Sequence, residues 1–394
     1  MSSFHSKAKI PTITYCGSCK LCNNCISPKI IPAGKGNRKI LIVTEKPSAE
    51  EDANNNHNGS ANKFLKTCLK RLGVDLYKDC IITNAVLCHN TQNIIEDNII
   101  NACRPSLMKT IQEHNPNVIV LLGPAALKSL LATTYKDKDD VGFVDKWNGF
   151  AIPCKSPNAW IIAAHSPTYV LKLNKDLVSL FFKQALKLAI SKSKSKPNSC
   201  INYEKQVELI LNPLHAVKKI NDITSTGKII AFDYETNCLK PEEKHSRIVS
   251  CSICRDGKET VAFPWTNNDI KNAMIPLLKS DIYKVACNMK FEDRWTNNKL
   301  GFHARNWLWD VMLAAHVLNN SRGITGLKFQ AFTSLGVEPY DEHIHPYLVS
   351  TKTNPINKID EIDLKELLLY NGLDSLLTYL LFQKQVKAFE RYKR

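Results

Sequence analysis

Short apolar segments alternate with helical patterns along the first half of the chain, and this alternation limits the folds that the chain can adopt. Uninterrupted apolar runs of this length are typical of strands that are buried on both faces. Buried strands joined by helices form a parallel sheet with helices on both sides, so we expect an α/β fold. The strands are expected at 39–45, 79–86, 117–123 and 159–165, with helices at 61–73 and 125–132.

A polar stretch, SKSKSKPNS at 191–199, separates this region from the rest of the chain. It alternates Ser with Lys before a Pro and has no apolar periodicity, which is typical of a solvated linker. A second α/β segment begins after it with the apolar strand KIIAFDYET at 228–236. Because 394 residues is an ordinary length for two domains, we expect a first domain over 1–190, a linker and connecting segment over 191–225, and a second domain over 226–394.

The charge of the chain favours a polyanionic partner. Its 53 Lys and Arg residues exceed its 37 Asp and Glu residues, for a net charge of +16. Such an excess attracts nucleic acid, although a basic protein without such a partner would have the same composition. No apolar run has the length of a membrane span, and the N-terminus lacks the apolar core of a secretory signal. We therefore expect a cytoplasmic protein without a membrane partner, whose 14 cysteines are thiols or metal ligands.

Acidic side chains occur at the end of the first strand of the second segment. Asp233 and Glu235 are two positions apart, so they point to the same face of the strand. Two such carboxylates repel each other unless a cation lies between them, and oxygen ligands suit Mg²⁺ or Mn²⁺. A pair of this kind also occurs by chance on exposed strands. Tyr370 and Asp374 are four apart in a helical pattern, so they lie on one face of that helix.

The order Asp-x-Glu, Asn-x-x-Phe-acid and Tyr-x-x-x-Asp over residues 226–390 resembles the proofreading-type 3′–5′ exonucleases of the four-acid, tyrosine-containing class. The flanking sequence is most similar to the exonuclease domain of family A DNA polymerases of phage type. The resemblance implies an RNase H-like (DnaQ-like) domain with a mixed five-stranded sheet and helices. It also implies hydrolysis with two Mg²⁺ or Mn²⁺ ions, one activating a water and the other stabilising the leaving 3′ oxygen.

The same resemblance implies a role for each matched residue. Tyr370 would orient the attacking water, and Asn288 would help to place the 3′ end of the substrate. The family usually has Asp after the Phe, but here Glu292 follows it and Asp293 comes next. We take Glu292 as the ligand, with Asp293 as the alternative, and expect a structural role such as helix capping for Asp310. The implied catalytic metal ligands are Asp233, Glu235, Glu292 and Asp374.

The chain ends at Arg394 without a polymerase domain. We therefore expect either a free-standing nuclease or the proofreading half of a split polymerase, whose polymerase subunit would be a separate partner. The expected substrates are single-stranded DNA 3′ ends and primer–template ends in replication or repair, with RNA ends as an alternative. The phage-type resemblance places the protein in the cytoplasm of a bacterial or phage-infected host cell.

Four cysteines, each three residues after the last, occupy the stretch CGSCKLCNNC at 16–25. Such thiols can bind zinc or an iron–sulfur cluster, or they can remain free. The equal spacing is close to that of ferredoxins and closes a zinc site poorly. Further along the chain, Cys88 and Cys103 are separated by fourteen residues. Cys68 and Cys80 lie in apolar patterns and are expected as buried thiols.

The Cys-x-x-Cys pair followed far downstream by Cys-x14-Cys-Arg-Pro resembles the family 4 (iron–sulfur) uracil-DNA glycosylases, over about residues 10–190. The segments ILIVTEKPSAEED (40–52), ITNAVLC (82–88), VIVLLGPAALKSLL (118–131) and AAHSPTYVL (163–171) follow the order of that family. The resemblance implies a glycosylase-like parallel sheet with flanking helices and a [4Fe–4S] cluster. The implied cluster ligands are Cys16, Cys19, Cys88 and Cys103, with Cys22 and Cys25 as bystanders or alternates.

The glycosylase site of that family is matched only in part. Glu45 matches the acidic residue near the sugar and water, Asn84 the residue that reads the uracil edge, and His165 the residue that stabilises the oxyanion. Thr44 and Ser48, however, replace glycines, and His57 stands where the family has the Phe that stacks on uracil. We therefore favour a non-catalytic DNA-binding domain over an active uracil-DNA glycosylase. A chain inert in both domains, serving as a polymerase accessory factor, is a further alternative.

Overall fold

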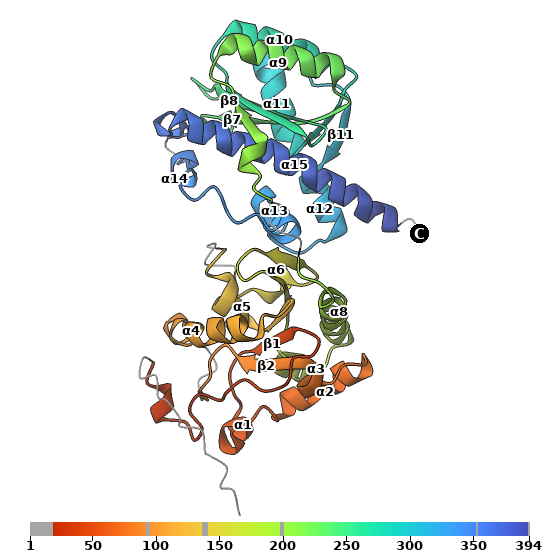
Figure 1. Cartoon of the computed structure of the whole chain (residues 1–394). Coiled ribbons are helices and arrows are strands. Elements are labelled where there is room, and N and C mark those ends of the chain that lie inside the picture. Colours follow the sequence, from red (N-terminus) through yellow and green to blue (C-terminus); the bar gives the residue numbers. More distant parts are fainter. Residues whose placement is uncertain (1–18, 92–94, 136–140, 198–200, 352–353, 393–394) are drawn as a thin grey trace, which may run out of the picture. The chain divides into compact units, whose positions relative to one another are not determined.

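The structure, a computed structural model, describes residues 19–91, 95–135, 141–197, 201–351 and 354–392. The chain divides into two compact units, Met1–Ser199 and Cys200–Arg394 (Figure 1). Each unit is an α/β fold with a sheet of its own, as predicted. Among the helices of the described ranges, none is long and apolar enough to cross a membrane.

The sheet of the first unit has the strand order β2-β1-β3-β5-β4. Its first four strands are parallel, and they are the four that the apolar runs predicted: β1 (Ile40–Thr44), β2 (Cys80–Asn84), β3 (Val118–Leu122) and β5 (Ala159–Ala164). The edge strand β4 (Ala151–Cys154) runs antiparallel to β5 and was not predicted, because its side chains alternate between buried and half-buried positions.

Helices cover both faces of this sheet (Figure 1). One layer consists of α2 (Ser60–Arg71), α7 (Pro167–Leu173) and α8 (Asp176–Lys192), whose apolar side chains pack on β1 and β3. The other contains α4 (Asp97–His114) and α5 (Pro124–Leu131). Shorter helices are η1 (Leu21–Asn23), α1 (Ala49–Asn54), α3 (Leu76–Asp79) and α6 (Val144–Trp147).

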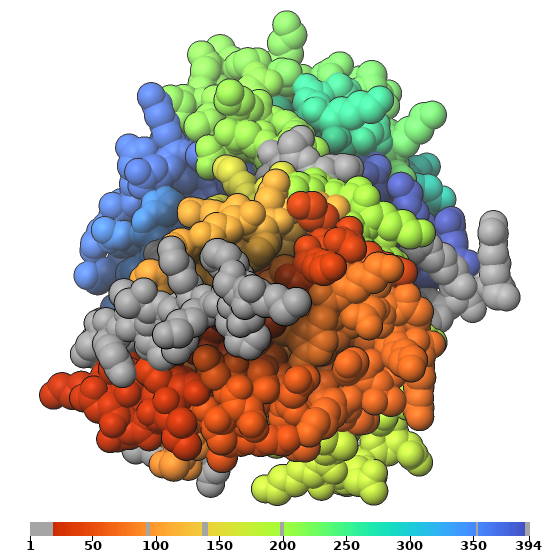
Figure 2. All heavy atoms as spheres, turned by 60° about the horizontal axis from the view of Figure 1, so that its bottom comes forward, coloured from red at the N-terminus to blue at the C-terminus, as the bar shows by residue number. Residues whose placement is uncertain are grey.

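The start of the described chain is held against α1. Asp52 of α1 accepts hydrogen bonds from the backbone N–H groups of Ile26 and Ser27, at 2.9 and 2.8 Å. Figure 2 shows the red N-terminal part of the described chain beside the orange part that follows it in sequence. Asp52 therefore fixes the backbone that directly follows the cysteine run.

The sheet of the second unit has six strands rather than the five that the resemblance implied. Its order is β11-β10-β7-β8-β9-β6, and the additional strand β6 (Val207–Leu209) pairs in parallel with β9. Both β6 and α9 (Pro213–Thr226) lie in the expected connecting segment, so the second unit begins before residue 226. The other strands are β7 (Ile229–Thr236), β8 (Ile248–Arg255), β9 (Glu259–Pro264), β10 (Tyr283–Ala286) and β11 (Trp307–Asp310).

The two faces of β7 contact different helices. Phe232 and Tyr234 join the apolar core under α9, α10 (Asn268–Lys279) and α11 (Met289–Leu300). The alternate side chains, including Asp233, face the long helix α15 (Leu364–Tyr392), which crosses the opposite face of the sheet (Figure 1). The remaining helices are α12 (Val311–Leu318), α13 (Leu327–Leu335), α14 (His345–Leu348) and η3 (Ile359–Glu361).

Gly372 allows α15 to approach the sheet at β6 closely. A Cβ atom at this position would lie 2.3 Å from Val207 Cγ1 and 3.3 Å from Ala262 Cβ. We expect Gly372→Ala to lower the free energy of unfolding by about 1–3 kcal/mol, because a crowded β-branched side chain must shift. The measurement is urea unfolding followed by circular dichroism. The exposed Glu366→Ala in the same helix should stay within about 0.5 kcal/mol of wild type, and equal stability of the two variants would contradict this account.

Candidate active site and cysteine cluster

Three carboxylates from two elements meet beside the carboxyl end of β7. Asp233 and Glu235 project from β7, and Asp374 projects from α15. Their carboxylate oxygens lie within 4.8 Å of one another, and this is the one group of metal-ligating side chains so close together in the part of the chain that the structure describes. Buried carboxylates at this separation repel each other, so the donor set fits a divalent cation with oxygen ligands.

The fourth acid of the cluster is Glu292, in the first turn of α11. Its carboxylate is buried and accepts a hydrogen bond from the backbone N–H of Tyr234, at 3.2 Å. Asp293, the alternative, points elsewhere: it accepts hydrogen bonds from the Ala304 N–H at 2.9 Å and from the His303 ring at 2.7 Å. The geometry therefore places Glu292, and not Asp293, beside the other acids.

Burial raises the pKa values of all four acids, and repulsion between them adds to the rise for Asp233, Glu235 and Glu292. For Asp233 and Glu235, burial is the largest cause, followed by the charge of the nearest carboxylates. The pKa of Glu292 is raised by burial and then by the charges of Asp233 and Glu235. Burial also raises the pKa of Asp374, although nearby Lys328 opposes it. Because a bound cation would relieve this repulsion, the arrangement fits a site for a divalent ion.

Two further residues predicted for this site are Asn288, directly before α11, and Tyr370, near the start of α15. Asn288 is the residue before α11 and has a left-handed backbone, with φ of 68°. Its N–H donates to Asp310, which is also the N-cap of α12, the structural role expected for it. Tyr370 lies one helical turn before Asp374, and burial and the neighbouring carboxylates raise its pKa.

The structure adds three polar residues that the sequence did not reveal. Asn371 donates from Nδ2 to Asp233 Oδ2 at 2.8 Å and so fixes that carboxylate. Tyr340, in the loop after α13, donates its hydroxyl to Asp374, and Lys328 of α13 forms an ion pair with the same carboxylate. Both loop and helix are distant from the acidic motifs in sequence, and no spacing rule connects them.

The residues predicted for the glycosylase site follow three parallel strands of the first unit. Glu45 follows β1, Asn84 ends β2 and His165 follows β5, at the strand edge where α/β proteins bind ligands. Burial raises the pKa of Glu45, whose carboxylate accepts a hydrogen bond from the Ala125 N–H at 3.3 Å. Gly123 permits this approach, because a Cβ atom there would lie 2.5 Å from Glu45 Cδ.

A cavity of about 600 Å³ opens beside these strand ends, and Thr44 is one of its lining residues. Thr44 and Glu45 line it, as does Tyr169, whereas Asn84 and His165 are not lining residues. The Thr44 hydroxyl donates to Asn84 Oδ1, and the buried Nδ2 of Asn84 has no hydrogen-bond partner. Thr44 therefore stands between Asn84 and the cavity. His165 is held by Asp145 Oδ1, at 2.8 Å.

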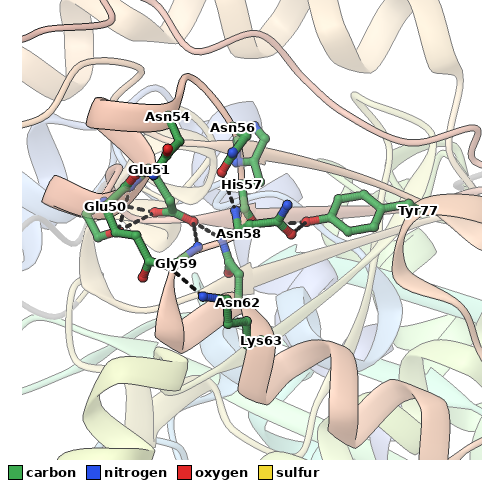
Figure 3. A network of polar contacts seen from close by, with 11 residues as sticks. Glu50, Glu51, Asn54, Asn56, His57, Asn58, Gly59, Asn62, Lys63 and Tyr77 are labelled. Atoms are coloured by element: carbon green, nitrogen blue, oxygen red, sulfur yellow. Dashed lines mark hydrogen bonds and ion pairs between the residues drawn. The ribbon is translucent and has the colours of Figure 1, made fainter.

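The loop at His57 is fixed in a way that removes its side chain from the cavity. His57 is buried, and its Nε2–H donates to the carbonyl of Ile31 at 3.0 Å. Tyr77 donates its hydroxyl to the His57 carbonyl at 2.9 Å, and Glu51 accepts from the Gly59 N–H at 3.2 Å (Figure 3). His57 is not a lining residue of the cavity. An aromatic ring for base stacking is therefore not supplied from this position.

Two other described cysteines, Cys25 and Cys103, act on the thiol of Cys88. Its thiol shares a hydrogen bond with Cys25, and the Lys29 N–H donates to its sulfur at 3.4 Å. Burial, and then the charges of Cys25 and Cys103, raise the pKa of Cys88 to about 12. The charge of Cys22 in turn raises the pKa of Cys25, for which burial is the largest cause. Converging thiols beside a backbone N–H fit an iron–sulfur cluster, whose sulfurs accept such hydrogen bonds.

This arrangement differs in one respect from the predicted ligand set. Among the described members of the run, Cys25, expected as a bystander or alternate, is the one hydrogen-bonded to Cys88. Cys16 lies outside the described residues, and Cys19 precedes η1. Cys68 and Cys80 are buried among apolar side chains, as predicted.

The second unit has an RNase H-like mixed sheet with a buried acidic cluster, and the first a glycosylase-like parallel sheet. Residues 31–189 match the Uracil DNA glycosylase superfamily, and residues 175–389 match the 3'-5' exonuclease family. The second match covers more than half of the chain. The chain therefore belongs to the 3'-5' exonuclease family and carries a domain of the Uracil DNA glycosylase superfamily in its N-terminal part.

Individual relatives match either unit. The type-4 uracil-DNA glycosylase of Pyrobaculum aerophilum is 34% identical over 115 residues, covering 28% of this chain and 58% of that protein. That of Saccharolobus solfataricus is 30% identical over 134 residues, covering 33% and 60%. The chain thus spans less than two thirds of the length of these relatives. Among solved structures, Brucella melitensis NrnC is similar with 17% identity and a TM-score of 0.35, covering 48% of this chain and 83% of that one.

Proposed function

We propose that the chain is a metal-dependent 3′–5′ exonuclease of the proofreading type that acts on DNA, with the first unit serving as a DNA-binding [4Fe–4S] domain. The observation that carries this proposal is the buried group of Asp233, Glu235 and Asp374, whose oxygens lie within 4.8 Å of one another. Such a cluster is costly to bury without cations. Membership of the 3'-5' exonuclease family supports the reaction.

Each residue of the site has a task in this proposal. Asp233, Glu235, Glu292 and Asp374 would hold two Mg²⁺ or Mn²⁺ ions, which when bound would supply an activated water and stabilise the leaving 3′ oxygen. Asn371 keeps Asp233 in place through its 2.8 Å hydrogen bond. Tyr370 would orient the attacking water, and Asn288 would place the 3′ end.

The substrate class follows from the charge of the chain and from the first unit. A net charge of +16 favours contact with the phosphate backbone, and binding should weaken as salt rises. Single-stranded DNA 3′ ends and frayed primer–template ends are the proposed substrates, in DNA replication or repair. We further propose a separate DNA polymerase subunit as partner and the cytoplasm of a bacterial or phage-infected cell as location.

Uracil-DNA glycosylase activity is the second candidate function, and the raised pKa of Glu45 beside a cavity of about 600 Å³ favours it. The contacts of Thr44 and His57 oppose it. The Thr44 hydroxyl donates to Asn84 Oδ1, the atom that would read the uracil edge. The ring of His57 is hydrogen-bonded to the carbonyl of Ile31. A glycosylase needs both edge recognition and a stacking ring to hold a flipped base. We therefore propose that this domain binds DNA without excising uracil.

One experiment tests both candidates. A 5′-labelled single strand and the same strand with one internal uracil are incubated with the full chain in Mg²⁺ or in EDTA. We expect stepwise shortening from the 3′ end of both strands in Mg²⁺ and none in EDTA. We also expect no alkali-labile break at the uracil under either condition. A break at the uracil that persists in EDTA would restore the glycosylase, and strands left intact in Mg²⁺ would refute the exonuclease.

A further inference from the structure

One lysine ammonium lies against the acidic cluster. Lys328 of α13 forms an ion pair with Asp374, and its side chain is 20% exposed. Its Nζ also donates to the Tyr340 hydroxyl at 2.9 Å. The rings of Tyr340 and Tyr370 lie 4.2 and 4.3 Å from the same nitrogen. The ammonium is thus held in a cage of two aromatic faces, a hydroxyl and a carboxylate.

The charge of Lys328 also affects the pKa values of two acids that it does not pair with. It lowers the pKa values of Asp233, Glu235 and Asp374, against the burial that raises them. In each case the other carboxylates or burial act in the opposite direction. The ion pair makes Lys328 the counter-ion of Asp374.

A divalent cation on these acids would compete with this lysine. The carboxylate oxygen Asp374 Oδ1 already accepts hydrogen bonds from Lys328 and from Tyr340. An ion placed among Asp233, Glu235 and Asp374 would also be repelled by the nearby ammonium, because like charges interact strongly where water is excluded. Metal binding at Asp374 and the Lys328 ion pair therefore oppose each other.

We propose that Lys328 is a built-in counter-ion that competes with the divalent metal for Asp374 and so sets the metal concentration at which the exonuclease becomes active. The inference rests on the proposed function of the acidic cluster. It assigns Lys328 a positioning and regulatory role and gives Tyr340 the task of holding the lysine in place. The lysine keeps the metal-free site folded, and its removal makes the site more receptive to metal.

The test is the affinity of the full chain for Mn²⁺ alone, measured by electron paramagnetic resonance of the free ion. We expect Lys328→Met to bind Mn²⁺ at least about tenfold more tightly than wild type, since one like charge has been removed from the site. Its metal-free melting temperature should fall, and the rise in melting temperature on adding Mn²⁺ should exceed that of wild type. A lysine with a merely structural role would not tighten metal binding.

Two control variants isolate the local charge. Lys328→Arg retains the charge and should bind Mn²⁺ within about threefold of wild type. Lys358→Met removes an exposed lysine paired with Glu361 and should leave the affinity unchanged. If Lys328→Met does not fold, Lys328→Gln is measured in its place with the same expectation.

The outcomes separate this inference from the proposed function. Unchanged or weaker Mn²⁺ binding by the Lys328 variant, with normal binding by wild type, overturns the counter-ion role alone. Absence of Mn²⁺ binding by wild type overturns the proposed metal-dependent function together with it. Tighter binding by the variant, with both controls near wild type, supports the inference.

Discussion

Replacing Asp233 by Asn should abolish the stepwise shortening of a 5′-labelled single strand, with a loss of at least about 10³-fold in rate. The expected size reflects the several kcal/mol of transition-state stabilisation that metal ions supply in such reactions. Asn has nearly the same shape as Asp, and its carbonyl can still accept the hydrogen bond from Asn371. The fold should therefore survive, and the loss should come from the missing charge. The measurement is the initial rate of product formation in Mg²⁺ by denaturing gel electrophoresis.

Adjacent acids in α11 provide the matched control for this result. Glu292→Gln should lose activity as Asp233→Asn does, because Glu292 is buried beside the cluster. Asp293→Asn should keep most of it, because Asp293 bonds to Ala304 and His303 instead. Equal activity of Asp233→Asn and wild type would show that the acids are not the reaction centre. A loss confined to Asp293→Asn would assign the fourth acid to Asp293.

The parts of the structure that the sequence predicted are those governed by local patterns. Strands β1, β2, β3 and β5 are uninterrupted apolar runs, because both of their faces are covered by helices. Strand and helix periodicities place Asp233 with Glu235, and Tyr370 with Asp374, on common faces, whereas Glu292 was assigned by resemblance to the exonuclease family. These patterns hold wherever the element forms, so one sequence suffices to recognise them.

The edge strands β4 and β6 lack the continuous apolar pattern that identified the other strands. Strand β6 has three half-buried residues, and it is a strand only because β9 offers a free edge for it. Strand β4 contains Pro153, which disfavours a central position but is tolerated at an edge. Both strands are too short for their apolar residues to be distinguished from those of loops.

Contacts made through tertiary folding were also beyond the sequence. Lys328 and Tyr340 lie 46 and 34 residues from Asp374, yet both contact its carboxylate. In the first unit, equal spacing in the cysteine run gave no means of distinguishing Cys19 from Cys25. The thiol of Cys88 donates to Cys25 across a long stretch of sequence, and Asp52 holds the backbone of Ile26 and Ser27 next to Cys25. The order of residue types along the chain does not indicate such contacts between distant residues.

Cys25 and Cys88 should both be required for the protein to hold an iron–sulfur cluster. We expect the full chain, purified without oxygen, to be brown and to hold about four iron atoms. Cys88→Ser should lose the colour and nearly all of the iron, because Cys88 lies at the centre of the converging thiols. Cys25→Ser should do the same, since Cys25 contacts Cys88 directly. Iron content and the visible absorption spectrum give the result without reference to activity.

The matched control for the cluster is a buried thiol outside it. Cys68→Ser, in α2 under the sheet, should keep the iron and the spectrum, although burying a hydroxyl there will lower stability. Cys19→Ser separates the two possible ligand sets. Iron lost from Cys25→Ser but retained by Cys19→Ser assigns the ligand to Cys25, and the opposite result restores the set with Cys16 and Cys19. Zinc in place of iron in the wild-type protein would refute the cluster itself, because zinc leaves the protein colourless.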